Sequence, residues 1–252
     1  MAKILVIDIG NTNIAAGLYI GRRLAKTMKL RTGEDVLYSK RLKAFMGSAH
    51  PEMAVISSVV PKALRRMKVS LRAFRPCMVV VLGKNAVVPI RNLYRIKGQV
   101  GQDRLVNAYG AKALYGAPAV VIDFGTAITF DIVSKKGDYL GGLILPGIDM
   151  SLAGLHERTA LLPKVGLAPA GRIIGKDTVG SIRGGVLFGF GAMCDALVAR
   201  YRKIFGGRVS VIATGGNSPL MKRYAKSIRK VDELLTLKGL FLLSCRLPSK
   251  NA

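Results

Sequence analysis

The sequence is poor in acidic residues, histidine, cysteine and tryptophan, and each shortage excludes a class of site. Its 252 residues include 14 Asp plus Glu, two His, three Cys and no Trp. Cys77, Cys194 and Cys245 are far apart in the chain and form no CxxC pair. We therefore expect reduced thiols, with neither a disulfide framework nor a zinc site, and we expect a cytoplasmic protein.

Long hydrophobic runs are also missing. The uncharged apolar stretch at residues 184–194 is well short of the roughly 18 residues that indicate a transmembrane helix. The apolar run at residues 4–6 meets Asp8 almost at once, which makes it too short for the apolar region of a signal peptide. We therefore expect no membrane partner. Neither GxxxxGK[ST] nor GxGxxG occurs, so a Walker-type or Rossmann nucleotide site has no support.

Basic residues dominate the charge. Forty Lys plus Arg against the 14 acids give a formal net charge of +26. A field of this size attracts polyanions, including nucleic acid. The basic residues nevertheless occur in short, dispersed clusters that are not interleaved with aromatics, unlike a single-strand binding platform. We interpret them as a solvated basic surface and do not expect a nucleic-acid partner.

The few acids are placed unevenly. Asp8, Asp103, Asp123 and Asp131 all lie in stretches rich in glycine or threonine and flanked by apolar residues. The segments VIDIGNTNIAAGLY, from residue 6, and VIDFGTAITFDIV, from residue 121, resemble each other. Each has an apolar strand, Asp-x-Gly, a hydroxyl or amide residue, and a second apolar strand. This weak internal repeat predicts two related lobes facing each other across a cleft.

Alternating strands and helices indicate an α/β protein. Apolar runs predict strands at residues 3–9, 13–19, 54–60, 78–82, 119–123, 129–133 and 208–213, the first two forming a hairpin. Helical spacing predicts helices at residues 103–115 and within residues 184–200. We expect an N-terminal lobe at residues 1–115 and a C-terminal lobe at residues 116–252.

The first Asp-x-Gly turn has the residues of a phosphate site. Gly10 lets the backbone approach a ligand closely. The exposed N–H groups of such a turn, with the side chains of Asn11 and Thr12, can hold phosphate oxygens. A carboxylate at a strand end, here Asp8, can hold Mg²⁺ through water. Asn13 completes this segment. By itself the segment could equally be an ordinary hairpin turn.

The second turn repeats this arrangement with Asp123, Gly125 and Thr126. Two such turns at opposed strand ends would hold one triphosphate from two sides, so the pair is more informative than either turn. A third segment, Thr214, Gly215 and Gly216, follows a strand and can let an adenosine lie against bare backbone. Strand–Gly-Gly loops are common, so this segment alone predicts little.

In this order, the three segments resemble those of the acetate and sugar kinase, heat-shock protein and actin superfamily. More closely, they resemble those of the type III pantothenate kinases. Four further features agree with that family: Gly101-Gln102-Asp103-Arg104, Tyr94 nine residues before Asp103, residues 156–163 with the sequence HERTALLP, and Gly175-Lys176-Asp177-Thr178. One departure is that Leu30-Arg31-Thr32 stands where many members carry a Trp-Arg pair.

The resemblance implies two actin-like (ribonuclease H-like) lobes, each a mixed sheet flanked by helices, with the ATP cleft between them. It also implies a homodimer that phosphorylates pantothenate with ATP, the first step of coenzyme A biosynthesis, and that requires Mg²⁺ and a monovalent cation, K⁺ or NH₄⁺.

The resemblance implies a role for each matching residue. Asp103 is the catalytic base. The nucleotide is held by Asp8, Gly10, Asn11, Thr12, Asn13, Asp123, Gly125, Thr126, Thr214, Gly215 and Gly216. Pantothenate is held by Tyr94, Gly101, Gln102, Asp103, Arg104, Thr159 from the partner subunit, and Thr178. The metal ligands are Asp8 and Asp123 for Mg²⁺ and Asp131 for K⁺.

Alternatives remain at this stage. Asp103 also fits the N-cap of the helix that follows it, where the helix terminus would lower its pKa. The chain could instead be a kinase of the same superfamily that acts on another small hydroxyl compound. It could also be a non-enzymatic regulatory or nucleic-acid-binding paralogue, although the intact set of four aspartates argues for activity.

Overall fold

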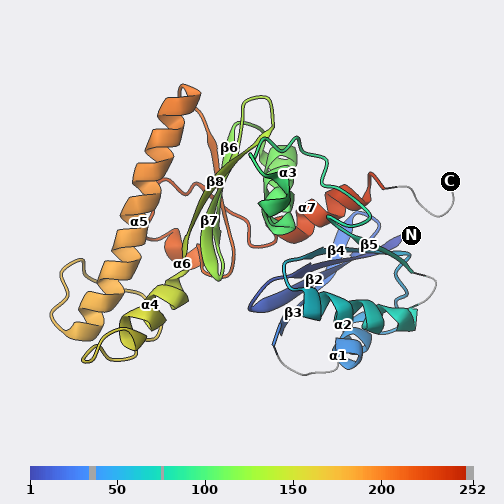
Figure 1. Cartoon of the computed structure of the whole chain (residues 1–252), viewed down its shortest axis with the longest axis horizontal. Helices are drawn as coiled ribbons and strands as arrows, with labels where there is room; N and C mark the ends of the chain where they lie inside the picture. The colour runs from blue at the N-terminus through green and yellow to red at the C-terminus, as the bar shows by residue number, and fades with distance from the viewer. Residues whose placement is uncertain (34–37, 75–76, 248–252) are drawn as a thin grey trace. The chain divides into compact units, whose positions relative to one another are not determined.

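The computed structural model describes residues 1–33, 38–74 and 77–247. Its secondary structure comprises two mixed five-stranded sheets with flanking helices (Figure 1), which confirms the expected α/β class. The chain divides into two compact units. Unit 1 is Met1–Ile90, Arg95–Gly110 and Leu235–Ala252, and unit 2 is Arg91–Tyr94 and Ala111–Leu234.

These units differ from the contiguous segments 1–115 and 116–252 expected from the sequence. The C-terminal helix α7 (Leu235–Ser244) returns to pack on β1, β2 and β4, so it groups with unit 1. The side chain of Phe241 in α7 stacks on Tyr19 with ring centroids 3.9 Å apart. The sequence pattern could not show this, because an apolar helix of ten residues does not reveal which sheet it covers.

Unit 1 contains a sheet in the order β3-β2-β1-β4-β5. Its strands are β1 (Lys3–Ile9), β2 (Asn13–Ile20), β3 (Arg23–Arg31), β4 (Met53–Ser58) and β5 (Met78–Val81). β1 and β2 form the expected antiparallel hairpin, and β1, β4 and β5 run parallel. β3 was not expected from the sequence, because its basic residues and largely exposed side chains give no apolar run.

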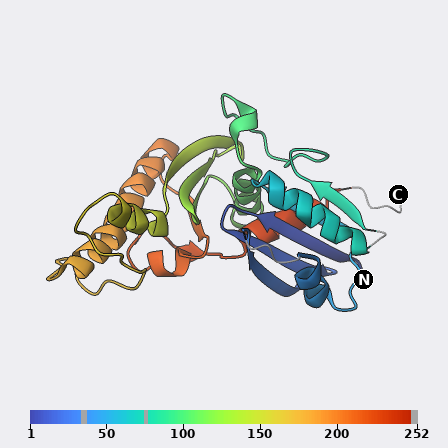
Figure 2. The ribbon, with the colours of Figure 1, turned by 60° about the horizontal axis from the view of Figure 1, so that its bottom comes forward.

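Helices cover both faces of this sheet. One face buries the side chains of Leu5, Ile7 and Ile9 in a core shared with α1 (Tyr38–Met46) and α2 (Pro61–Leu71). Figure 2 shows α2 lying along the strands of this sheet. The short 3₁₀ turns Arg72–Phe74 and Lys97–Gln99 complete the connections of this unit.

The opposite face of the same sheet receives α7, and α3 (Gln102–Tyr115) packs against α7. The two helices approach backbone to backbone where Gly110 faces Gly239. A Cβ on Gly110 would lie 3.2 Å from the Cα of Gly239, so glycine permits this close approach. The packing of α3 on α7 therefore depends on glycine at these two positions.

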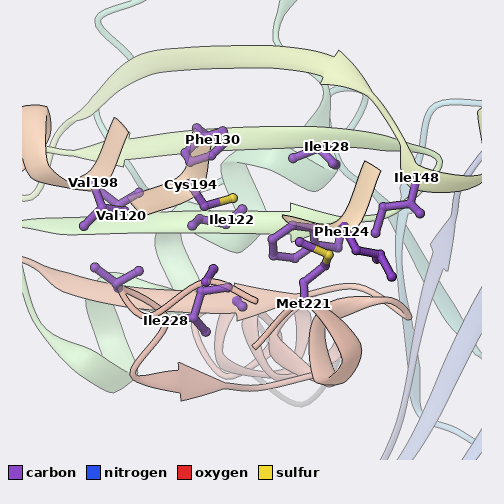
Figure 3. Packing of buried hydrophobic residues seen from close by; sticks show 14 of the residues in the cluster. Val120, Ile122, Phe124, Ile128, Phe130, Ile148, Cys194, Val198, Met221 and Ile228 are labelled. Carbon is purple, nitrogen blue, oxygen red and sulfur yellow. The ribbon is translucent and has the colours of Figure 1, made fainter. Parts of the chain in front are cut away.

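Unit 2 contains a sheet in the order β10-β9-β6-β7-β8. Its strands are β6 (Ala119–Phe124), β7 (Ala127–Val133), β8 (Tyr139–Pro146), β9 (Ser210–Thr214) and β10 (Lys230–Val231). One face is covered by α4 (Ile148–Glu157), α5 (Thr178–Phe205) and α6 (Ser218–Met221). In Figure 3, Ile122 and Phe124 of β6 and Phe130 of β7 pack with Cys194 of α5 and Met221 of α6.

Helix α5 is longer than the sequence predicted, at 28 residues. Its buried residues Leu187, Gly191, Cys194 and Val198 recur at three- and four-residue intervals and face the sheet. By length and composition alone α5 could cross a membrane, with a hydropathy of 1.5 over its most apolar window. The core helix of a soluble protein passes the same test, and 33% of that window is buried, so the expectation of no membrane partner stays a prediction.

Candidate active site

The first Asp-x-Gly turn lies where β1 passes into β2. Asp8 is partly exposed near the end of β1, and its Oδ1 is buried. The turn closes through a hydrogen bond from Gly10 N to Asn13 O at 3.0 Å. Asn11 and Thr12 are exposed, so their side chains are open to a ligand. The structure thus shows a closed turn with two exposed polar side chains, and its binding of phosphate stays a prediction.

Two residues that the sequence reasoning missed brace this turn. Thr32 Oγ1 donates to Gly10 O at 2.7 Å, and Thr32 N donates to Thr12 O at 3.0 Å. The buried Tyr38 hydroxyl donates in turn to Thr32 O at 2.6 Å. Thr32 belongs to the Leu30-Arg31-Thr32 segment that departs from the family pattern. The only sequence signal that could have identified Thr32 was the presence of a hydroxyl residue beside a turn.

Asp103 lies in the first turn of α3. The helix begins at Gln102, and Gly101 O accepts from Leu105 N at 3.3 Å, so Gly101 takes the capping position. The interpretation of Asp103 as the N-cap is therefore wrong, because Asp103 is the second residue of the helix, two positions after the cap. A Cβ on Gly101 would collide with Asp103 Oδ1, so the bare glycine leaves room for the carboxylate. The Gln102 side chain lies over Gly83, and Arg104 is buried.

Burial raises the pKa of the Asp103 carboxyl above its ordinary value of 3.8. A hydrogen bond from Arg104 N to Asp103 Oδ1 at 2.9 Å and the charge of Arg104 lower the pKa, but by less. The sequence predicted instead that the helix terminus would lower the pKa. Desolvation outweighs the lowering effects, because Asp103 is partly buried although it lies in the first turn of α3.

Unit 1 brings the Asp8 turn and the start of α3 to the same end of its sheet. Val59 N donates to Ile9 O at 3.1 Å, which joins the end of β4 to the end of β1. A Cβ on Gly101 would lie 3.6 Å from Val59 Cγ1, so the Gly101–Asp103 corner packs on the same segment. The Asp8 turn and a carboxylate with a raised pKa therefore meet at the carboxyl ends of β1 and β4.

The second Asp-x-Gly turn lies at the end of β6 in unit 2. Asp123 stands in register with Thr129 of β7 and Thr214 of β9. Gly215, at φ +85°, lies against Asp123 Oδ1 and the backbone of Phe124, where any side chain would collide. The turn with Gly125 and Thr126 and the loop with Gly215 and the exposed Gly216 are thus adjacent.

Asp131 lies deeper in the same sheet. It has no exposed surface, Oδ2 accepts from Thr129 Oγ1 at 3.0 Å, and Oδ1 accepts from the Tyr139 hydroxyl at 2.9 Å. Its carboxylate and the two hydroxyl oxygens are hard oxygen donors of the kind that K⁺ takes. A cation bound at Asp131 would have to replace these hydrogen bonds or take the same oxygen atoms as ligands.

Tyr94 packs on Gly141 of β8. The Tyr94 ring carbons would lie 3.0 and 3.1 Å from a Cβ at Gly141, whose φ is +112°. The neighbouring Leu93 N donates to Tyr139 O at 2.9 Å, which ties the Tyr94 segment to unit 2. The structure therefore places Tyr94 in unit 2 while Asp103, nine residues later, lies in unit 1.

Thr159 and Thr178 are both exposed in unit 2. Thr159 Oγ1 donates to Leu155 O at 2.6 Å at the end of α4. Thr178 begins α5, which Asp177 caps by accepting from Gly180 N at 2.7 Å. Beside Thr178, residues 169–172, residues 174–177 and the first turns of α5 line a hollow of about 320 Å³ that carries Arg172, Lys176 and Arg183.

The predicted site residues thus form two sets. Unit 1 holds Asp8, Gly10, Asn11, Thr12, Asn13, Gly101, Gln102, Asp103 and Arg104, and unit 2 holds Tyr94, Asp123, Gly125, Thr126, Asp131, Thr159, Thr178, Thr214, Gly215 and Gly216. Within the described residues no three His, Cys, Asp or Glu side chains cluster as a metal site. Mg²⁺ does not need such a cluster, since it commonly takes one or two carboxylates, water and phosphate.

Comparison with known proteins decides the family. The sequence model of the type III pantothenate kinases matches residues 4–200. The chain is 38% identical over 248 residues to the type III pantothenate kinase of Moorella thermoacetica, covering 94% of this chain and 96% of that protein. It is 40% identical over 250 residues to that of Myxococcus xanthus, covering 95% and 97%. The chain belongs to the type III pantothenate kinase family.

Solved structures agree on the fold. A Campylobacter jejuni protein provisionally assigned to a Baf family of transcriptional activators matches with a TM-score of 0.61 at 22% identity, covering 96% of this chain and 100% of that one. A polyphosphate/ATP-glucomannokinase from Arthrobacter matches with a TM-score of 0.51 at 16% identity, covering 98% and 100%. At these identities the likeness concerns the fold alone, and it confirms the actin-like architecture expected from the sequence.

Proposed function

We propose that this protein transfers the γ-phosphoryl group of ATP to the hydroxyl of pantothenate. The product is 4′-phosphopantothenate, and the reaction is the first step of coenzyme A biosynthesis. Family membership over nearly the whole chain supports this assignment. The observation that carries it in the structure is the position of Asp103: a half-buried carboxylate with a raised pKa at the same end of the unit 1 sheet as the Asp8 turn.

Asp103 accepts the proton of the pantothenate hydroxyl in this proposal. Phosphoryl transfer needs mainly positioning and charge neutralisation, with an acceptor for that proton. A raised pKa makes the carboxylate a stronger base. Arg104, adjacent and buried, supplies a fixed positive charge for the carboxylate or amide oxygens of the substrate, and Gly101 and Gln102 line the same corner.

Both Asp-x-Gly turns bind phosphate in this proposal. Gly10, Asn11, Thr12 and Asn13 form one phosphate-binding turn, and Gly125 and Thr126 form the other. The bare backbone of Gly215 and Gly216, next to Thr214, receives the adenosine. The carboxylates of Asp8 and Asp123 end their strands beside these turns and fit Mg²⁺, which would neutralise phosphate charge. We keep Asp131, with its hydroxyl oxygens, as the candidate ligand for K⁺ or NH₄⁺.

The test is a coupled ADP-release assay with pantothenate, with and without K⁺, on the wild type and Asp103→Asn. General bases contribute about 10²- to 10⁴-fold to rate, so we expect turnover to fall by that factor with the fold retained. Thermal unfolding provides the fold control. Near-normal turnover in the variant would reject Asp103 as the base, and a wild type that is inactive on pantothenate would reject the proposed reaction.

A homodimer fits the exposed surface of unit 2. Leu161, Ile173 and Ile174 are 93%, 75% and 69% exposed. A stripe of small exposed residues also runs along α5, comprising Ser181, Gly185, Gly189, Ala192, Ala196 and Ala199. Exposed apolar surface of this kind favours association. In the dimer Thr159 would complete the pantothenate site of the partner subunit, and Tyr94 and Thr178 would contact substrate.

Light scattering after size exclusion tests the homodimer. We expect a dimer for the wild type and a monomer for Gly189→Arg, because an arginine on the exposed face of α5 would obstruct the interface. The substitution should leave the fold of the single chain intact, since a Cβ on Gly189 meets no atom within 4 Å. A variant that stays dimeric would exclude α5 as the interface. The expected cytoplasmic location is a further proposal, supported by the scattered thiols Cys77, Cys194 and Cys245.

A different acceptor within the same superfamily is the main alternative. A panel of small hydroxyl compounds separates the two possibilities, since pantothenate should be the only rapid acceptor. A regulatory or nucleic-acid-binding role would instead require salt-dependent DNA binding without kinase turnover.

A further inference from the structure

The hydroxyl of Ser57 is buried and makes no hydrogen bond with the described residues of the nucleotide-free protein. Ser57 lies near the end of β4 and has no exposed surface. Among the residues that the structure describes, its Oγ has no hydrogen-bond partner. Buried polar atoms are hydrogen-bonded in the great majority of cases, so an exception calls for an explanation. An alanine would fill the same space without this cost.

The position of Ser57 supplies that explanation. In the parallel pairing of β1 with β4, Ser57 stands directly opposite Asp8. Along these strands Ile7, Ile9 and Ile56 point into the core shared with α1 and α2. Because side chains alternate between the two faces of a sheet, Asp8 and Ser57 both point to the other face. Neighbouring strands lie about 4.8 Å apart, so the hydroxyl is within reach of the carboxylate, directly or through one water.

We propose that Ser57 is a positioning residue for Asp8. When nucleotide and Mg²⁺ are bound, the Ser57 hydroxyl donates a hydrogen bond, directly or through one ordered water, to the Asp8 carboxylate. This bond would fix the rotamer of the Asp8 carboxylate, which would hold Mg²⁺ through water. The inference rests on the proposed function, because it assigns the metal-nucleotide to the Asp8 turn.

The chain contains a matched control for Ser57. Ser227 is also buried, and its Oγ likewise has no hydrogen-bond partner within the described part of the chain. Ser227 lies in unit 2, where its backbone N donates to Asp195 Oδ1 at 2.7 Å, and Asp195 is no part of the proposed site. Replacing either hydroxyl with alanine removes the same kind of buried group, but only Ser57 faces Asp8.

The experiment measures two quantities for Ser57→Ala and Ser227→Ala. The first is the thermal unfolding midpoint of the nucleotide-free protein, which we expect to stay equal to that of the wild type or to rise in both variants. The second is the affinity for Mg-ADP by calorimetry. We expect it to fall about 3- to 10-fold in Ser57→Ala, the net effect of one hydrogen bond, and to be unchanged in Ser227→Ala. The Mg²⁺ concentration for half-maximal binding should rise only in Ser57→Ala.

A double variant tests whether Ser57 acts through Asp8. In an Asp8→Asn background, adding Ser57→Ala should weaken Mg-ADP binding no further. The proposal would be overturned if Ser57→Ala bound Mg-ADP with wild-type affinity. It would also be overturned if Ser57→Ala weakened Mg-ADP binding as much in the Asp8→Asn background as in the wild-type background. A lower unfolding midpoint in nucleotide-free Ser57→Ala would also overturn it, since it would indicate a structural role. If binding behaves as expected but the wild type does not phosphorylate pantothenate, the positioning role stands and the proposed reaction fails.

Discussion

Replacing Gly215 with alanine tests the loop of unit 2 that we propose for nucleotide binding. The backbone of Gly215 has φ +85°, and a Cβ there would contact Asp123 Oδ1 and lie 2.6 and 2.7 Å from the C and O atoms of Phe124. The left-handed conformation costs an L-residue about 1–2 kcal/mol. Overpacking against rigid backbone adds about 1–3 kcal/mol. The expected loss in the free energy of unfolding is therefore about 2–5 kcal/mol.

Gly116 separates the two contributions. Its φ is +82°, but a Cβ there would meet no atom within 4 Å. Gly116→Ala should therefore show only the backbone cost of about 1–2 kcal/mol. For a chain of this size each kcal/mol lowers the unfolding midpoint by roughly 2–4 °C, which differential scanning calorimetry resolves.

Nucleotide affinity distinguishes the variants further. The alanine side chain in Gly215→Ala must displace the Asp123 carboxylate or the loop. If this displacement reduces the binding free energy of Mg-ADP by roughly 1.4 kcal/mol or more, the affinity falls at least about tenfold. Gly116→Ala should bind as the wild type does. The reasoning is refuted if Gly215→Ala loses no more stability than Gly116→Ala and binds Mg-ADP normally.

Three further substitutions have defined outcomes. Because the pKa of Asp103 is raised in the folded protein, kcat/KM should fall as pH drops through that raised value, and a pH–rate profile measures the limb. The same shift means that the wild type loses stability as pH rises from the unfolded pKa through the raised folded pKa of Asp103. The unfolding midpoint of Asp103→Asn relative to that of the wild type should therefore rise over this range, and a difference that does not change with pH would contradict the shift. Tyr139→Phe removes the hydrogen bond to Asp131 and should lower the free energy of unfolding by about 1–3 kcal/mol in urea titrations, and a loss below that range would contradict the bond. Thr32→Val removes the bond to Gly10 O and should raise the KM for ATP about 3- to 10-fold while leaving the KM for pantothenate unchanged; equal changes in both would indicate a general loss of structure.

Local sequence patterns predicted the elements that carry the nucleotide turns. β1, β2, β6 and β9 were expected within a few residues of their observed bounds, because short apolar runs ending at glycine are strong signals. β3 and β8 were missed. β3 is largely exposed and rich in Lys and Arg, and the Gly141-Gly142 pair interrupts the apolar run of β8.

The candidate site was predictable in its residue types but not in its energetics. The Asp-x-Gly pattern identified Asp8 and Asp123, whose turns form as expected. The direction of the pKa shift at Asp103 was not predictable, since it depends on how completely the start of α3 is buried. Thr32 was also missed, because its hydrogen bonds join residues about twenty positions apart in the sequence.

The sequence by itself determined the turns, the order of the motifs and the family, since each depends on residues close together in the chain. Only the tertiary structure decided the pairing of Ser57 with Asp8, the packing of α7 on the first sheet and the desolvation of Asp103. These features arise from contacts between distant segments. Burial and register are properties of the folded neighbourhood, and local pattern carries no information about them.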